Sequence, residues 1–470
     1  MKNIFLMLLI SFLIVAFGTH SALAKGRKKV GEVRGYHAES PHPYPQGKGE
    51  RPEVWTDTVV SPNATFIRIH FVGFHLEPGD FVTVSSLDGS QEWVYRGKGP
   101  HGNGNFWTFS VDGDTAIVRI HGGPVQGHGY RIDAVGHGTE DFTEVICWPD
   151  GREPIACHIQ EEEVDSAQKP VALLIFQSGP FLYACTGFLV DGSTPNTLMT
   201  ANHCISTQTE TETLEARFNY QYTTCDGYGL DDDYVYYNGG TLLKTNSVDM
   251  KGKKKGGLDY TLLTLQKNSS SQEEDPESIW GKLKPTIATP SVRDQMWFIQ
   301  HPGGRPKEIG YYQDDIYNPY DVCQIDEINQ TYGRSARESQ MAYKCDSEGG
   351  SSGSPIIDSV TGLVIGLHHF GGVSNDLCLN AATMMGPICE DAGSLLKCVE
   401  SDGCTPIGIE GPYDNPTCDD DLDNDCDGLT DSDDPNCQPP SQADCSQYTD
   451  RNSCRSDSNC KWKKGQCFNR

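Results

Sequence analysis

Basic residues are scarce in this chain of 470 residues, which has 37 Lys and Arg against 65 Asp and Glu and a formal net charge of −28. Proteins that bind nucleic acids need basic side chains to neutralise phosphates, so this balance argues against a nucleic acid as partner. The shortage is sharpest from Ser401 to Pro440, where there is no Lys or Arg and there are 12 Asp or Glu. That composition separates the C-terminal part from the rest.

Long apolar runs are lacking after the first 24 residues, so we expect no transmembrane segment. Residues 1–24 begin with Lys2, continue with an apolar stretch from Ile4 to Phe17, and end on Ala22-Leu23-Ala24. This pattern is typical of a secretory signal peptide, and the run is short for the alternative, a membrane anchor. We therefore expect a secreted, extracellular protein. Its 18 cysteines, all after this segment, are even in number and predict disulfides.

Changes in composition divide the chain into six parts, because the remainder is too long for one core. In order, we expect a signal peptide (1–24), a basic linker or pro-segment (25–55), a β-sandwich (56–140), a larger second domain (145–400), an Asp-rich loop (405–438) and a small disulfide-rich module (441–470).

The third part consists of short alternating apolar runs separated by turn sequences, a pattern that predicts an all-β sandwich. The expected strands are 64–71, 80–84, 106–109, 116–120 and 130–135. The order of the runs, especially 76–82 and 113–119, resembles a CUB-like domain. This resemblance implies a binding role, with an extracellular protein or glycan as partner, and no catalytic motif is found here.

Three segments of the larger domain carry residues suited to acyl transfer. In the segment from Glu348 to Asp358, small residues flank Ser352. Small neighbours are needed because an attacking hydroxyl requires an uncrowded oxygen and backbone N–H groups that point at the oxyanion. Upstream, His203 ends the run Thr200-Ala201-Asn202, and Asp259 opens an alternating strand pattern at 258–263. The order His, Asp, Ser is one of three that occur among serine hydrolases.

The motifs Thr-Ala-Asn-His-Cys and Gly-Ser-Ser-Gly-Ser-Pro resemble the two signature segments of trypsin-like, chymotrypsin-fold serine proteases. The resemblance implies an all-β fold with a double Greek-key β-barrel, a protein or peptide substrate, and no cofactor for catalysis. It also implies roles for single residues: Ser352 as nucleophile, His203 as general base, Asp259 as its orienting carboxylate, the N–H groups of Gly350 and Ser352 as oxyanion hole, and disulfides Cys185–Cys204 and Cys345–Cys378.

The chain departs from the digestive trypsins just before the nucleophile. Ser351 stands where those enzymes carry an aspartate that pairs with a new N-terminus, and no Ile-Val-Gly-Gly-like sequence occurs near residue 165. The domain therefore resembles more closely the bacterial lysyl and glutamyl endopeptidases. Two substrate pockets remain open: Asp346 would favour Lys or Arg before the cleaved bond, whereas Ser347 with His368 would favour Glu.

An alternative function is a secreted CUB-like adhesion protein that carries an inactive protease-like module. Such modules usually lack a member of the triad, and all three residue types are present here, which favours a serine endopeptidase.

The Asp-rich loop has the pattern D-x-D-x-D-G-x-x-D-x-x-D, which resembles EF-hand-like and thrombospondin-type calcium repeats. Calcium takes six to eight oxygen ligands on a tightly curled loop. The expected ligands are the carboxylates of five aspartates and the carbonyl of a leucine: Asp423, Asp425, Asp427, Leu429, Asp431 and Asp434. The alternative is a solvated acidic linker. A calcium-dependent binding protein is a third functional hypothesis, but it leaves residues 145–400 unexplained.

Overall fold

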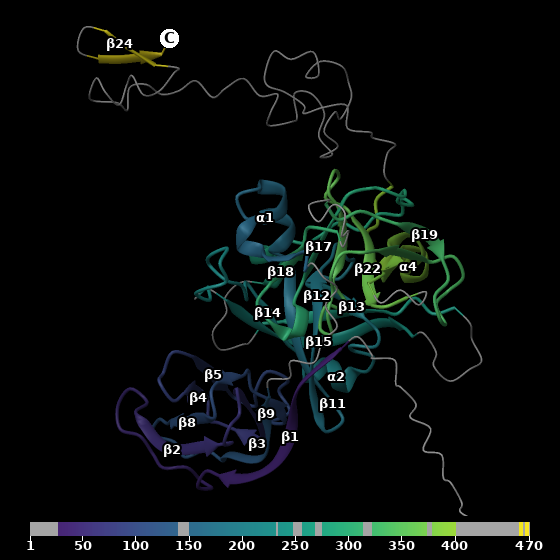
Figure 1. Cartoon of the computed structure of the whole chain (residues 1–470). Helices are drawn as coiled ribbons and strands as arrows, with labels where there is room; N and C mark the ends of the chain where they lie inside the picture. Colours follow the sequence, from purple (N-terminus) through teal and green to yellow (C-terminus); the bar gives the residue numbers. More distant parts are fainter. Residues whose placement is uncertain are drawn as a thin grey trace, which may run out of the picture.

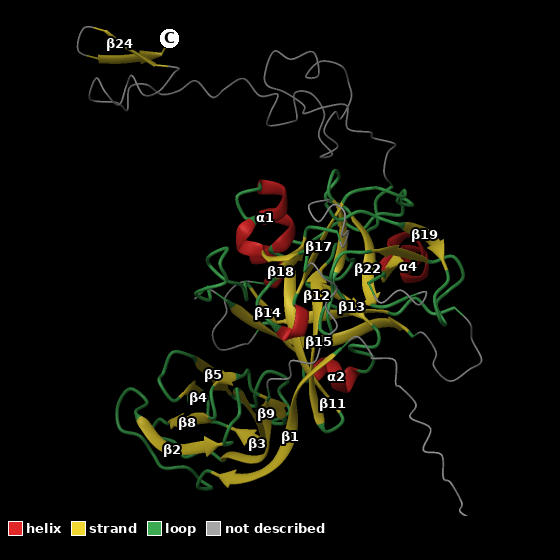
Figure 2. Cartoon of the chain, in the orientation of Figure 1, coloured by secondary structure: helices red, strands yellow, loops and turns green. Residues whose placement is uncertain are grey.

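The structure is a computed structural model, which describes residues 27–139, 150–231, 234–247, 256–267, 275–313, 322–373, 378–400, 460–463 and 466–469. Strands dominate it and helices are few and short (Figure 2). A β-sandwich is followed by a domain with two barrel-like sheets, and strand β1 joins the two (Figure 1). The predicted all-β class with a double β-barrel is confirmed.

The predicted β-sandwich is present in residues 28–138. Sheet β2-β8-β4-β5 faces strands β1, β9 and β3, with β6 and β7 paired to β3. Aromatic side chains from both sheets share one core, in which the rings of Phe71 and Tyr95 lie 6.5 Å apart. The strands are β1 Lys28–Glu39, β2 Glu53–Val60, β3 Phe66–His75, β4 Phe81–Ser86, β5 Glu92–Arg96, β6 Phe106–Trp107, β7 Val111–Asp112, β8 Thr115–His121 and β9 Gly129–Gly138. Its specific likeness to a CUB-like domain stays a prediction.

The first barrel of the larger domain is closed. Its six strands follow the order β11-β14-β15-β16-β13-β12, and β12 pairs again with β11. All five residues of β13 are buried, as expected where one face meets the barrel core and the other meets the rest of the domain. The strands are β11 Val171–Ser178, β12 Phe181–Leu189, β13 Thr197–Ala201, β14 Glu215–Phe218, β15 Val235–Asn246 and β16 Tyr260–Gln266.

The second sheet of this domain has the order β10-β18-β17-β21-β22-β23-β20-β19 and forms a half-barrel against the first. Apolar residues from both units share one core, including Met199 of β13 and Leu367 of β22. The strands are β10 Arg152–Pro154, β17 Met296–Gln300, β18 Glu308–Gly310, β19 Glu327–Gln330, β20 Gln340–Tyr343, β21 Pro355–Asp358, β22 Val364–Phe370 and β23 Asn380–Met384.

The helices are short and contact the sheets, α2 at β15 and β11 and α4 at β22 and β23. They are η1 Ile155–Cys157, α1 Glu162–Gln168, α2 Gln208–Glu212, α3 Pro276–Trp280, η2 Pro302–Gly304, α4 Met385–Ala392 and η3 Gly393–Leu395. Among the described residues no helix has the length and apolarity needed to cross a membrane.

The prediction of a linker over residues 25–55 is wrong for Lys28–Glu39, which form strand β1. This strand pairs with β12 of the barrel through its first residues and with β9 of the sandwich through the rest. Only two of its twelve residues are buried, so paired backbones hold most of its length, while Val30, Tyr36 and Ala38 pack partly buried against neighbouring apolar clusters. Its few apolar residues do not alternate regularly, which is why the strand was not predicted.

The sandwich and the first barrel also meet through a buried ionic network. Glu215 of β14 is fully buried, and its Oε2 accepts the N–H of Ser110 at 2.7 Å. Arg68 of β3 places its Nε 3.6 Å from the same oxygen, and Arg217 Nε donates to Oε1 at 2.6 Å. Glu215 and Arg217 of the barrel thus share this network with Arg68 and Ser110 of the sandwich.

Three predicted parts lie wholly or largely outside the described residues. These are the signal peptide at 1–24, the Asp-rich loop at 405–438 and most of the small module at 441–470, of which β24 Cys460–Lys463 and β25 Gln466–Asn469 form a hairpin.

Candidate active site

His203 lies just after β13, at the edge of the first barrel. The neighbouring Cys204 is bonded to Cys185 of β12, as predicted, with the two Cα atoms 6.3 Å apart. The imidazole side chain is 17% exposed, so it faces a partly open surface while its loop is fixed to the barrel.

Asp259 is the buried partner of this histidine. The N–H of His203 donates to its Oδ1 at 2.9 Å, and the ring Nδ1–H donates to Oδ2 at 2.8 Å. Burial raises the pKa of Asp259, but the charge and hydrogen bond of His203, with those of His369, outweigh this effect and hold it far below its usual range. The carboxylate is therefore ionised, and it fixes the tautomer of His203 with the proton on Nδ1.

His369 is a contact of Asp259 that sequence reasoning missed. Its Nδ1 lies 3.2 Å from Asp259 Oδ2, and its Nε2 contacts Gln340 Oε1. The amide of Gln340 is oriented by its other bonds, since its Nε2 donates to Ser339 and Thr383 hydroxyls that themselves donate to carbonyls. Both ring nitrogens of His369 thus face oxygen atoms, which fixes the orientation of the ring beside Asp259. The repeated histidine at 368–369 was the available sequence signal.

Ser352 lies in a loop tied to β12 and β22. Its carbonyl accepts the N–H of Thr186 at 2.9 Å, and the N–H of Gly353 donates to His368 O at 2.8 Å. Gly353 has φ +90°, and a Cβ there would lie 2.1 Å from the Thr186 carbonyl, so only glycine fits. The backbone on both sides of the nucleophile candidate is consequently fixed.

Two donors of this loop are unused within the part of the chain that the structure describes: the N–H groups of Gly350 and Ser352 meet no acceptor. Gly350 has φ +107°, a conformation that favours glycine and turns its peptide units. Its carbonyl accepts the Thr186 hydroxyl at 2.9 Å, which anchors that turn. The arrangement offers two backbone donors to an incoming oxygen.

The Nε2 atom of His203 is likewise buried and has no hydrogen-bond partner among the described residues. The next residue, Cys204, places its sulfur 3.7 Å from the carbonyl oxygen of Ser352, so the two loops are in contact. A free imidazole acceptor thus lies in the region where Ser352 sits.

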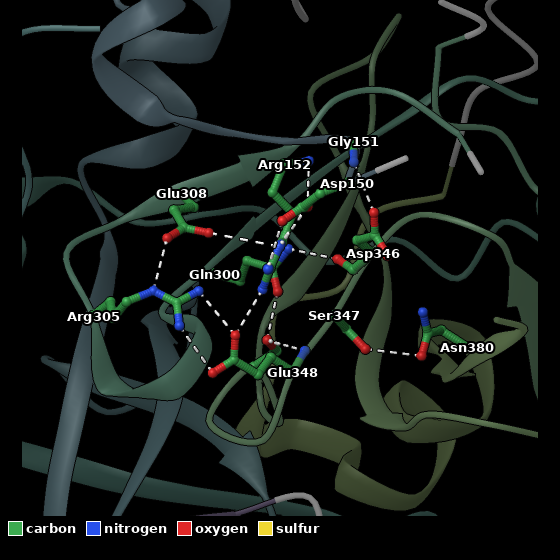
Figure 3. Close-up of polar contacts among 11 residues, drawn as sticks. Asp150, Gly151, Arg152, Gln300, Arg305, Glu308, Asp346, Ser347, Glu348 and Asn380 are labelled. Atoms are coloured by element: carbon green, nitrogen blue, oxygen red, sulfur yellow. Dashed lines mark hydrogen bonds and ion pairs between the residues drawn. The ribbon is translucent and has the colours of Figure 1, made fainter. Parts of the chain in front are cut away.

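The three pocket candidates have different surroundings. Asp346 is 4% exposed, and its Oδ2 accepts the N–H of Gly151 at 2.7 Å. The side chain of Ser347 points away from that of Asp346, and its hydroxyl donates to Asn380 Oδ1 at 2.8 Å (Figure 3). His368 is hydrogen-bonded to the Tyr343 hydroxyl at 2.7 Å, and burial holds its pKa well below the usual range, so it is neutral.

The predicted disulfide Cys345–Cys378 is wrong. Cys345 is bonded to Cys323, with Cα atoms 5.7 Å apart, a normal spacing for a disulfide. The N–H of Cys323 donates to the carbonyl of Tyr311, and the nearby Gln313 forms a β-bridge with Cys345. These contacts bring Cys323 next to Cys345. Cys378 is in a disulfide as well.

Among the described residues, no group of three or more His, Cys, Asp or Glu is arranged to hold a metal ion.

Residues 152–382 match the model of the lysyl endopeptidase C-terminal domain. The chain is 27% identical over 332 residues to the secreted RxLR effector protein 73 of Plasmopara viticola, covering 66% of this chain and 76% of that protein.

Solved structures with a similar course include a Glu endopeptidase and the active form of the Rv3671c protease from M. tuberculosis. The first has 16% identity and a TM-score of 0.36, and covers 51% of this chain and 94% of its own. The second has 14% identity and a TM-score of 0.34, and covers 56% and 96%. The family match at 152–382 and the two-barrel fold together support a chymotrypsin-fold serine protease domain in this chain.

Proposed function

We propose that this protein is a secreted serine endopeptidase in which Ser352, His203 and Asp259 form the catalytic triad. The observation that carries the proposal is the hydrogen bond from His203 Nδ1 to the buried carboxylate of Asp259, which leaves the imidazole Nε2 unpartnered among the described residues and next to the Ser352 loop. A neutral imidazole with a free Nε2 is the base that a serine hydroxyl needs.

In this mechanism Ser352 Oγ attacks the carbonyl carbon of the scissile peptide bond while His203 Nε2 takes its proton. The carbonyl oxygen becomes an oxyanion that accepts the N–H groups of Gly350 and Ser352. His203 then gives the proton to the leaving amine, and the C–N bond breaks to leave an acyl-enzyme. Water, deprotonated by His203, then attacks the acyl carbon, the ester bond to Ser352 Oγ breaks, and His203 returns the proton to that oxygen as the acid leaves. Asp259 stays ionised and stabilises the imidazolium in both halves.

An extracellular location fits the disulfides. Four bridges lie between described cysteines: Cys157–Cys225, Cys185–Cys204, Cys323–Cys345 and Cys389–Cys398. Such bridges persist in oxidising compartments, as expected for a chain that carries the signal-peptide pattern at 1–24.

Labelling with a fluorophosphonate tests the proposal. The reagent reacts only with a serine that has a working base and oxyanion hole, so we expect one adduct, on Ser352, found by peptide mapping. A protein that stays unlabelled would instead favour the adhesion protein with an inactive module.

Substrate preference is tested by cleavage of a peptide library. Basic residues before the cut would eliminate the Ser347 and His368 pocket, and Asp346→Asn should then lower kcat/KM about a hundredfold, because a charged substrate loses its buried partner. Acidic residues would eliminate the Asp346 pocket, and Ser347→Ala should then give the loss. Either variant should retain activity when the other pocket is the one in use.

We also propose that the Asp-rich loop, which lies outside the described residues, binds calcium through the residues that match the repeat pattern. Its carboxylates repel one another without a cation, so the loop should open when calcium is removed. Limited proteolysis at residues 412–438 should therefore be faster in EDTA than in excess calcium. Equal rates would favour a solvated linker.

A further inference from the structure

Glu348 is a buried carboxylate four residues before Ser352. Its side chain is 1% exposed and lies between two arginines, as Figure 3 shows. Arg152 Nη1 donates to its Oε2 at 2.9 Å, and Arg305 Nη1 donates to its Oε1 at 3.0 Å. A carboxylate this enclosed is stable as an ion only while both partners remain, because an unpaired buried charge is strongly unfavourable.

Ser351, next to the nucleophile, is held by neutral groups. Its hydroxyl donates to Gln300 Oε1 at 2.5 Å and accepts the N–H of Glu348 at 3.1 Å. Ser351 is fully buried, and it stands at the position where trypsins carry the aspartate that a new N-terminus pairs with. A new N-terminal amine would need a negative charge at this position, and the side chain of Ser351 carries none.

Residues at the start of the half-barrel, well inside the chain, contact the segment before Ser352. Gly151 donates its N–H to Asp346, and Arg152 reaches Glu348 from the first residue of β10. Strand β10 pairs with β18, and β18 begins three residues after Arg305. Arg152 thus lies in a paired strand and Arg305 lies just before one, and neither is at a chain end.

We propose that the ion cluster of Arg152, Glu348 and Arg305 is the device that positions the nucleophile loop. The cluster takes the place of a new N-terminus. The protease domain is therefore active without proteolytic cleavage of the chain at the start of the barrels. The inference rests on the proposed function of Ser352. Arg152, Glu348 and Arg305 act as positioning residues, through the backbone of residues 348–352.

The first test compares Glu348→Gln with Glu308→Gln in the full chain. Glu308 contacts the same two arginines, at 3.2 Å from Arg305 and 3.8 Å from Arg152, but it lies in β18 and not in the loop. We expect Glu348→Gln to lower the rate of fluorophosphonate labelling of Ser352 at least about tenfold, and Glu308→Gln to stay within about twofold of wild type.

Hydrogen exchange at residues 349–353 supplies a readout that needs no activity. Exchange should be faster in Glu348→Gln than in Glu308→Gln, because the loop loses its anchor. Arg305→Gln, a change at a side chain that is 35% exposed, tests the same cluster if Glu348→Gln does not fold. Wild-type labelling and exchange in both Glu348→Gln and Arg305→Gln would overturn the proposal.

The second test asks whether a cut is needed. Secreted protein whose backbone is intact from residue 27 to residue 400, as shown by its mass, should be labelled at Ser352. Labelling that begins only after cleavage between residues 139 and 170 would overturn the cluster proposal and leave the triad standing. Protein that is unlabelled both before and after the cut would overturn the triad, while the exchange comparison still decides the cluster.

Discussion

Replacing Ser352 by alanine is expected to lower kcat for casein by about 10⁶-fold, because the three triad residues act as a unit. The substitution removes one oxygen at a site where the backbone is fixed by Thr186 and His368, so the fold should be retained. Initial rates with labelled casein, together with the circular dichroism spectrum, measure both effects.

Ser359→Ala is the matched control for this experiment. Ser359 is half-buried and lies seven residues further along the chain, and within the described residues its one hydrogen bond is donated by its backbone N–H to the carbonyl of Gln295. Its substitution should leave the rate unchanged within about twofold. Casein cleavage by Ser352→Ala at the rate of this control would show that Ser352 is not the nucleophile.

The sequence predicted those parts of the site that depend on short motifs. A histidine loop closed by Cys204 and a glycine-rich nucleophile loop are local, since each is set by residues adjacent in the chain. Gly350 and Gly353 illustrate this, because their positive φ values can be anticipated from residue type. The half-buried strands of the sandwich were predicted for the same reason, through their alternation.

What escaped prediction depends on partners distant in the chain. His369 meets Asp259 across 110 positions, and Glu348 meets Arg152 across 196. A local pattern such as the repeated histidine at 368–369 does not show which distant residue the side chain will contact. Cys345 was assigned to Cys378 by a family resemblance, but Cys323, whose N–H donates to the carbonyl of Tyr311, is the cysteine bonded to it.

Replacing Glu215 by alanine is expected to lower the free energy of unfolding by about 3–5 kcal/mol. Burial raises the pKa of Glu215, but the charges of Arg217 and Arg68 outweigh this effect and lower it, so the side chain is ionised at neutral pH. Its removal leaves Arg217 and Arg68 buried without their shared anion. The N–H of Ser110 also loses its acceptor. Urea unfolding followed by tryptophan fluorescence measures the shift of the midpoint.

Glu212→Ala provides the control, as Glu212 is an exposed glutamate three positions away and its change should stay within about 0.5 kcal/mol. Because Glu215 belongs to the barrel and Ser110 and Arg68 to the sandwich, its loss weakens both domains at once. The sandwich should therefore unfold with the barrel in wild type, and earlier than the barrel in Glu215→Ala. Separate transitions already in wild type, or equal midpoints for the two variants, would show that the network does not couple the domains.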